Sequence, residues 1–267
     1  MDNRPIGLFD SGVGGLTVVK QVMKVLPHEE TIYFGDTARV PYGAKTKETV
    51  TKFSEQIIRF LLTKDVKAII IACNTASSNS YDELIRVFPD IPIFEVITAG
   101  VESCISATKN KRVGIIGTYA TVRSAAYERG IKQRVPDMRV FTKACPLFVP
   151  LAEEGWTDND IARLTAETYL DELLKNNVDT IVLGCTHYPL LKRCISGVVG
   201  ESVTLVDPAK ATAMKMKKFL EQNDMLNGGA EEKHTFYVSD HTPSFDFLCE
   251  RLLKKKYTAE KTDIEKY

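Results

Sequence analysis

Residues 68–77 read AIIIACNTAS, an apolar run that reaches a cysteine and passes into polar residues suited to a helix start. An uninterrupted apolar run of this length predicts a strand buried on both faces, as in parallel sheets. The same pattern returns at 181–189 as IVLGCTHYP. The sequence therefore predicts that Cys73 and Cys185 lie at equivalent strand ends.

A second pair of motifs repeats at nearly the same spacing. PIGLFDSG at 5–12 is echoed by RVGIIGTY at 112–119. Two motifs that recur in the same order indicate two related halves, and we expect them to be pseudo-symmetric. Because ligands of open α/β sheets bind beyond the carboxyl ends of the strands, both cysteines should face one cleft between the halves.

Other short apolar runs alternate with helical patterns along the chain. Between them, Phe53, Ile57, Phe60 and Leu61 recur at the spacing of an amphipathic helix. This alternation predicts an α/β fold with mainly parallel sheets. A polar stretch at 221–233 is expected to be a surface loop. The predicted strands are 6–9, 31–34, 68–72, 91–97, 112–117, 180–184, 202–206 and a last one at 235–240.

Composition excludes several classes of protein. Of the 267 residues, 44% are hydrophobic and 26% charged, and 35 Lys and Arg balance 35 Asp and Glu. A net charge of zero gives no long-range attraction to nucleic acid or anionic membrane, so neither is expected as a partner. No apolar stretch reaches the roughly 18–20 residues of a membrane helix. The N-terminus lacks a signal-peptide core, so we expect a cytoplasmic protein.

The six cysteines form no CxxC pair, which argues against a zinc ribbon or a thioredoxin-type redox pair. Cys73 and Cys185 each lie between a strand end and a helix start, a position that favours the thiolate. The alternative interpretation of a cysteine is a small buried hydrophobe. We prefer that alternative for the remaining four, which are Cys104, Cys145, Cys194 and Cys249.

Two other side chains suit proton transfer. His187 follows Cys185 by two residues, and imidazole titrates near neutral pH. Asp10 ends the first predicted strand, where a carboxylate can be a proton partner, a cation ligand or a helix cap. The glycines of GVGG at 12–15 would let backbone N–H groups turn toward an anion.

Cofactor motifs do not fit. GVGGLT at 12–17, with Asp36 beyond it, resembles a dinucleotide site, but the third glycine of GxGxxG falls on Thr17 and the charged Asp10 precedes the turn. There is no GxxxxGK[ST] P-loop. Metal-ligand spacing is limited to Cys-x-His at 185–187. We therefore expect no nicotinamide cofactor and no metal.

Four longer motifs identify a family. They are IGLFDSGVGGLTV at 6–18, YFGDTARVPYG at 33–43, ACNTAS at 72–77 and GCTHYPLL at 184–191. In these motifs and their order, over nearly its whole length, the chain resembles the cofactor-independent glutamate racemases of the aspartate/glutamate racemase superfamily. The resemblance implies interconversion of L-glutamate and D-glutamate without pyridoxal phosphate or any other cofactor, supplying D-glutamate for bacterial peptidoglycan.

The same resemblance implies an architecture. We expect two α/β domains, one formed by residues 1–97 with 207–267 and the other by residues 98–206. The active site would lie in the cleft between them. Enzymes of this kind are usually homodimers, so a homodimer is expected. VITAG at 96–100 lacks a proline that many relatives carry there, a departure that concerns a hinge or loop rather than the chemistry.

The resemblance also implies roles for individual residues. Cys73 and Cys185 would exchange the Cα proton on opposite faces of the substrate, with Asp10 as the partner of Cys73 and His187 as the partner of Cys185. Glu153 would orient His187. The implied substrate-binding residues are Asp10, Ser11, Tyr42, Gly43, Asn74, Thr75, Thr186 and His187, and Thr118 and Thr121 could also line the cleft.

Three alternatives remain. Aspartate racemases share the fold and the cysteine pair but usually resemble CTE at the second cysteine, so CTH at 185–187 favours glutamate over aspartate or another amino acid. A non-catalytic amino-acid-binding or regulatory protein would not need both cysteines. A cysteine hydrolase would need one nucleophile and would accumulate a covalent adduct.

Overall fold

The structure is a computed structural model that describes residues 1–229 and 233–267. In this part of the chain, one sheet has six strands in the order β10–β9–β2–β1–β3–β4, and all neighbours are parallel. Both ends of the chain contribute, because β2 pairs with β1 on one side and with β9 on the other. The strands are β1 (Ile6–Asp10), β2 (Thr31–Gly35), β3 (Ala68–Ile71), β4 (Ile93–Glu95), β9 (His234–Val238) and β10 (Ala259–Lys261).

The second sheet repeats the arrangement of the first. In the described residues its order is β6–β5–β7–β8, again parallel throughout. β5 is central like β1, and β7 lies beside it as β3 lies beside β1. The predicted pseudo-symmetric α/β fold with parallel sheets is therefore confirmed. The strands are β5 (Arg112–Gly117), β6 (Arg139–Ala144), β7 (Thr180–Gly184) and β8 (Thr204–Val206).

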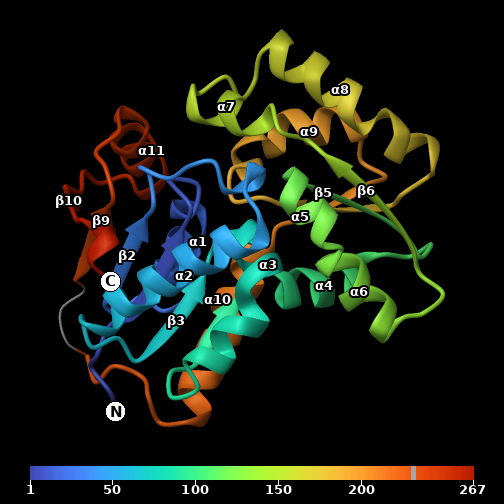
Figure 1. Ribbon diagram of the computed structural model, residues 1–267. Helices are drawn as coiled ribbons and strands as arrows, with labels where there is room; N and C mark the ends of the chain where they lie inside the picture. Colours follow the sequence, from blue (N-terminus) through green and yellow to red (C-terminus); the bar gives the residue numbers. More distant parts are fainter. Residues whose placement is uncertain (230–232) are drawn as a thin grey trace.

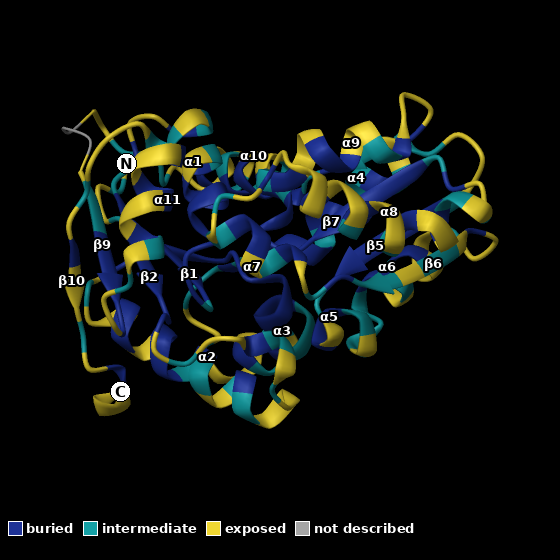
Figure 2. Ribbon diagram, turned by 90° about the horizontal axis from the view of Figure 1, so that it is seen from above, coloured by how far each residue is buried: buried dark blue, intermediate teal, exposed yellow. Residues whose placement is uncertain are grey.

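Helices cover both faces of each sheet, and the central strands are buried between them (Figures 1 and 2). Successive residues of a strand point to opposite faces. In β3, accordingly, Ile70 packs with α1, α10 and α11, whereas Ile69 and Ile71 pack with α2 and α3. On the second sheet α7, α8 and α9 cover one face, and α4 and α6 the other. The helices are α1 (Leu16–Val25), α2 (Lys47–Leu62), α3 (Asn74–Val87), α4 (Val96–Ala107), α5 (Tyr119–Ser124), α6 (Ala126–Arg134), α7 (Phe148–Glu153), α8 (Asp160–Lys175), α9 (Lys192–Val199), α10 (Pro208–Gln222), α11 (Pro243–Leu253) and the 3-10 turns η1 (Tyr42–Ala44), η2 (Tyr188–Leu191) and η3 (Ile264–Lys266).

The predicted strand at 91–97 is wrong at its C-terminal end. The Glu95 side chain accepts hydrogen bonds from the backbone N–H groups of Ile97 and Thr98, and this cap starts α4 at Val96. VITAG therefore forms the first turns of a helix. The predicted loop at 221–233 begins only after α10 ends at Gln222, and residues 230–232 lie outside the described part of the chain.

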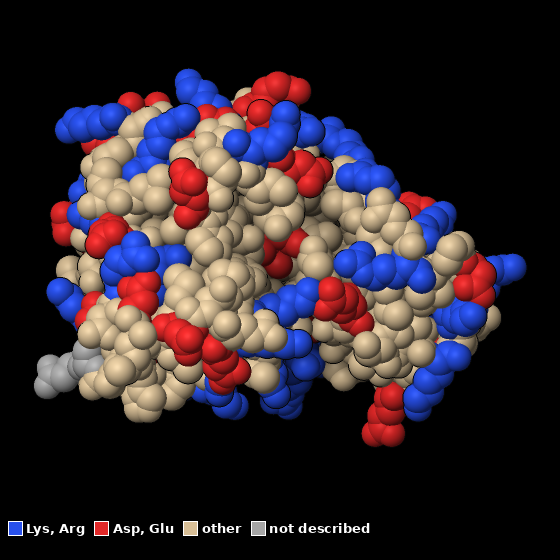
Figure 3. Space-filling model, turned by 90° about the horizontal axis from the view of Figure 1, so that it is seen from below, with Lys and Arg blue, Asp and Glu red and all other residues tan. Residues whose placement is uncertain are grey.

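Strands β6 and β10 were not predicted because they are edge strands with polar sequences, RVFTKA and AEK. Such strands carry no buried apolar run to identify them. On the face of the molecule seen in Figure 3, Lys and Arg side chains are interspersed with Asp and Glu side chains, in keeping with the balanced composition. None of the helices in the described residues is long and apolar enough to cross a membrane.

Candidate active site

A cavity of about 430 Å³ lies where the carboxyl ends of the two sheets face each other. A volume in this range suits a small-molecule ligand. Both sheets supply its walls. The segments of the six-stranded sheet contribute Ser11, Val40, Pro41, Tyr42, Gly43, Ala44, Cys73, Asn74 and Thr75, and those of the four-stranded sheet contribute Thr118, Tyr119, Pro146, Val149, Pro150, Glu153, Cys185, Thr186 and His187.

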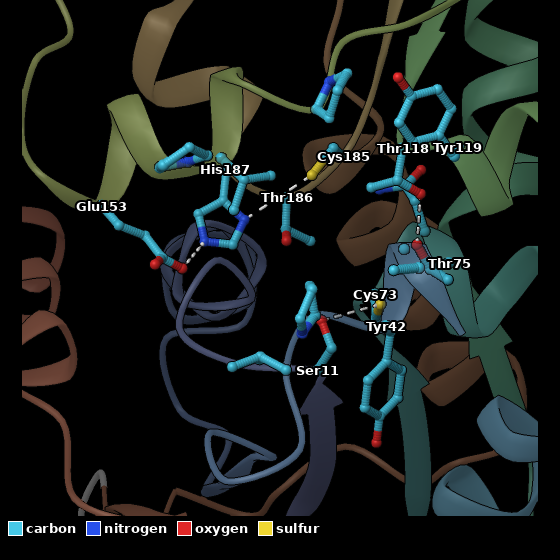
Figure 4. Close-up of a pocket in the computed structure, with 18 residues that line it drawn as sticks. Ser11, Tyr42, Cys73, Thr75, Thr118, Tyr119, Glu153, Cys185, Thr186 and His187 are labelled. Carbon is cyan, nitrogen blue, oxygen red and sulfur yellow. Dashed lines mark hydrogen bonds and ion pairs between the residues drawn. The ribbon is translucent and has the colours of Figure 1, made fainter.

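The two predicted cysteines meet in this cavity. Cys73 follows β3 and caps α3, whereas Cys185 follows β7 directly and His187 stands at the start of η2. The two cysteine side chains are almost fully buried, yet both line the cavity from opposite sheets (Figure 4). Cys73 Sγ donates to Ser11 Oγ at 3.5 Å and accepts from the Ala76 N–H at 3.4 Å. A ligand in the cavity would have one sulfur on each side.

The protonation state of Cys73 differs from the sequence prediction. Burial, followed by the negative charge of Asp10, raises the pKa of this thiol to about 12. The hydrogen bonds of Cys73 with Ser11 and with the Ala76 N–H lower the pKa but are outweighed. The helix N-terminus therefore does not produce a thiolate at Cys73, and this side chain is a thiol.

Cys185 has a different partner, the imidazole of His187. Its Sγ lies 3.9 Å from His187 Nδ1, and His187 Nε2 lies 2.9 Å from Glu153 Oε1 (Figure 4). Burial lowers the pKa of His187, but the hydrogen bonds to Cys185 and Glu153 and their charges raise it to about 10. His187 is therefore an imidazolium at neutral pH, and it donates to the carboxylate on one side and faces the sulfur on the other.

Asp10 lies behind the cavity wall. Its carboxylate accepts from the Gly12 N–H at 3.1 Å and from Thr186 Oγ1 at 3.3 Å. Complete burial raises the pKa of Asp10, and the charge of His187 opposes this. Among the contacts of the described residues, Asp10 reaches the Cys185 turn directly but acts on Cys73 through its charge.

Among the other predicted binding residues, three threonines and Tyr42 have side-chain contacts that define their positions. Thr75, Thr118 and Thr121 form a triangle of hydroxyls 2.9–3.3 Å apart that joins the two halves, with Thr121 outside the cavity lining. The Tyr42 hydroxyl points away from the cavity and donates to Asp36, so Tyr42 offers its ring and backbone (Figure 4). Asp36 also binds Arg39 at 2.8 Å and is thus a buried support for Tyr42.

Sequence reasoning missed what Gly14 does. A Cβ at this position would lie 2.4 Å from Thr186 Oγ1 and 2.6 Å from the His187 ring. Thr17 Oγ1, one turn on, donates to the Thr186 carbonyl at 3.0 Å. The GVGG turn therefore admits and fixes the Cys185–His187 segment. The available signal in the sequence was the glycine at the start of a predicted helix. Nothing in the sequence indicated that this glycine contacts the Cys185–His187 segment of the other half.

Gly14→Ala should reduce turnover about tenfold or more, because displacement of a reacting group by a fraction of an ångström is costly. The added methyl group forces Thr186 or His187 to move. Steady-state kinetics measures the effect, with Gly197→Ala on α9 as the matched control, since its Cβ meets nothing within 4 Å. Wild-type kinetics in Gly14→Ala would contradict the assigned packing.

The other cysteines have no place in this site. Cys104, Cys145, Cys194 and Cys249 are buried in the hydrophobic cores, as predicted. Within residues 1–229 and 233–267, no group of three or more His, Cys, Asp or Glu side chains is arranged to hold a metal ion.

Comparison with known proteins identifies the family of this site. The sequence profile described as Asp/Glu/Hydantoin racemase matches residues 16–216, a range that includes both cysteine turns. The chain belongs to the Asp/Glu/hydantoin racemase family.

Individual members of the family are similar over the full length. The glutamate racemase of Geobacter metallireducens is 51% identical over 95% of this chain and 94% of its own. The crystal structure of glutamate racemase from Francisella tularensis in complex with D-glutamate has a TM-score of 0.93 at 41% identity, covering 100% of both chains. That of Thermus thermophilus glutamate racemase in complex with β-chloro-D-alanine has a TM-score of 0.90 at 41% identity, with the same coverage.

Proposed function

We propose that this protein is a glutamate racemase that interconverts L-glutamate and D-glutamate by two-base proton transfer at Cα. The observation that carries the proposal is the pair of buried cysteine side chains that face one cavity from two different sheets. Inversion of a stereocentre needs a base on one face and an acid on the other. The full-length similarity to enzymes named glutamate racemase supports glutamate as the substrate.

The proposed reaction conserves protons. One cysteine, as thiolate, takes the Cα proton and becomes a thiol, while the electron pair stays on Cα. The other cysteine, as thiol, then donates its proton to the opposite face and becomes the thiolate. Before turnover, the raised pKa of Cys73 suits it to the acid role, and the imidazolium of His187 beside Cys185 suits that sulfur to the base role.

The polar groups of the cavity are proposed to bind the substrate. Hydroxyls, amide groups and backbone N–H groups at helix starts favour carboxylates, and fixed dipoles also stabilise charge that develops on the substrate during proton transfer. The start of α3, next to Cys73, provides such N–H groups. The proposed binding residues are Ser11, Tyr42, Gly43, Asn74, Thr75, Thr118 and Thr186, with Asp10 and Thr121 behind them.

Glu153 is proposed to keep His187 protonated. Glu153→Gln retains a hydrogen-bond acceptor but removes the charge that raises the pKa of His187. The alkaline limb of the pH–rate profile should therefore move to lower pH by about one unit, because His187 loses its proton earlier. The profile of kcat/KM measures this shift. Glu154→Gln, at the exposed neighbouring position, is the control and should leave the limb in place. An unmoved limb in Glu153→Gln would remove Glu153 from the mechanism.

We propose further that the molecule has two domains, residues 1–97 with 207–267 and residues 98–206. The strands of the six-stranded sheet all fall in the first set and those of the four-stranded sheet in the second, which supports this division. A cytoplasmic homodimer that supplies D-glutamate for peptidoglycan is proposed on the family resemblance, and light scattering of the purified protein tests the dimer.

The deciding experiment uses the purified protein with L-glutamate in D₂O, without added cofactor. Loss of optical rotation together with deuterium at Cα is expected, and L-aspartate should show neither. Exchange with L-aspartate instead would favour the aspartate racemase alternative. A folded, reduced sample that exchanges neither amino acid would overturn the proposed function in favour of a binding protein.

A further inference from the structure

A buried tyrosine lies between the two cysteine turns. Tyr127, on α6, is 2% exposed, and its hydroxyl donates to Asn74 Oδ1 at 2.7 Å. Asn74 directly follows Cys73. On its other side, the Tyr127 ring lies 3.3 Å from where a Cβ of Gly184 would be, immediately before Cys185. Tyr127 therefore contacts both turns from behind the cavity.

This hydrogen bond determines which end of the Asn74 amide faces the cavity. Burial, followed by the charge of Glu95, raises the pKa of Tyr127 well above its ordinary value, so its hydroxyl keeps its proton. A buried hydroxyl proton needs an acceptor. Among the described residues that acceptor is Asn74 Oδ1. The amide nitrogen is thereby left for the cavity, which Asn74 lines.

An amide nitrogen donates hydrogen bonds only, whereas an amide oxygen accepts them. With the nitrogen toward the cavity, Asn74 attracts a carboxylate. With the oxygen toward it, Asn74 would repel a carboxylate and attract an ammonium group. We propose that Tyr127 is a positioning residue for substrate binding, which fixes the Asn74 amide with its nitrogen toward a carboxylate of the amino-acid substrate.

The packing of Tyr127 is specific. A Cβ at Gly100 would lie 2.8 Å from the Tyr127 ring and 3.1 Å from its hydroxyl oxygen, so Gly100 leaves room for this side chain. Because α6 covers the second sheet and Asn74 starts α3 beside the first, the bond links the two halves. The inference rests on the proposed function, since it concerns binding of the same substrate.

The first test is Tyr127→Phe, which keeps the ring and removes the hydroxyl. KM for both enantiomers of glutamate should rise about tenfold, because the freed amide turns its oxygen toward the cavity for about nine-tenths of the time, while kcat changes by less than about threefold. In an Asn74→Ala background, Tyr127→Phe should have no further effect on KM. A KM within twofold of wild type, or increases that multiply in the double variant, would overturn the inference.

A matched control separates positioning from stability. Tyr188 is equally buried, and its hydroxyl donates to the Cys145 carbonyl at 2.8 Å away from the cavity lining. Tyr188→Phe should lower the melting temperature about as much as Tyr127→Phe but leave KM unchanged. Equal increases of KM in the two variants would assign the Tyr127 effect to general loosening of the fold.

Asn74→Asp tests the amide orientation without changing Tyr127. Aspartate still accepts the Tyr127 proton but presents a carboxylate oxygen where the nitrogen was. KM should therefore rise more than in Asn74→Ala. A KM in Asn74→Asp equal to or below that of Asn74→Ala would mean that an acceptor is tolerated there, contrary to the inference. Wild-type protein that shows no exchange in D₂O would instead refute the proposed function itself.

Discussion

Cys73→Ala and Cys185→Ala should each reduce racemisation by about a thousandfold or more, since a positioned acid or base contributes 10²–10⁴-fold and the lost thiol has no substitute in the cavity wall. Both residues are small and buried, so Ala leaves the fold intact. Steady-state optical rotation measures the loss, with Cys249→Ala as a control that removes a buried thiol from the core around α11. Near-full activity in either active-site variant would refute the two-base scheme.

The two cysteine variants should also differ from each other. A single remaining cysteine can remove the Cα proton from one face and return a solvent-derived one to the same face. Each variant should therefore retain slow deuterium exchange with one enantiomer of glutamate, and the two variants should act on opposite enantiomers. Proton NMR in D₂O with the separate enantiomers follows this. Exchange of the same enantiomer by both variants would mean that the sulfurs do not flank Cα.

His187→Ala should slow the chemical step by about a hundredfold, the scale of one lost proton-transfer partner. The structure places the imidazolium of His187 against Cys185 and not against Cys73, so the transition state at Cys185 should rise more. Because the two enantiomers of glutamate have equal free energies, kcat/KM must fall equally in both directions. The difference between the proton transfers at Cys185 and at Cys73 therefore has to be measured with isotopically labelled substrate.

Isotope effects identify the slowed step. The enantiomer deprotonated by Cys185 should show a full primary effect when deuterated at Cα. The other enantiomer should lose its Cα label to solvent faster than it racemises, since its carbanion waits for a proton from Cys185. His28→Ala, at an exposed position, is the control. Equal effects on both enantiomers would make His187 a binding or scaffold residue.

Much of the site was predictable because its residues follow buried strands. Cys73 and Cys185 come directly after apolar runs, and the repeat places both at carboxyl strand ends. The place of a residue directly after a buried strand depends on the local sequence, so it can be predicted without knowledge of the tertiary contacts. The sequence also indicated a role for the GVGG turn, but as an anion-binding loop rather than as the surface that receives His187.

Features that depend on specific side-chain contacts, near or far along the chain, could not be predicted. The Tyr42 hydroxyl donates a hydrogen bond to Asp36, and the Tyr127 hydroxyl donates one to Asn74. The hydrophobic periodicity of the sequence does not predict either hydrogen bond. The protonation of Cys73 was mispredicted for the same reason. A helix start is visible in sequence, but the burial that outweighs it depends on the whole fold.

The pairing of β2 with β9 has a consequence for how the chain is made. During synthesis β1–β4 leave the ribosome first and all strands of the second sheet follow. The outer edge of β2 stays unpaired until β9 has been made. The C-terminal segment also holds the loop that carries Tyr42. Ser239 Oγ accepts a hydrogen bond from the Ala38 N–H at 2.8 Å, and Glu265 forms an ion pair with Arg39 at 2.9 Å. The first sheet therefore keeps an open strand edge until β9 is available to pair with β2, and such an edge is the kind of surface on which nascent chains aggregate. A polypeptide shortened before His234 would expose that edge and leave the Tyr42 loop without its support.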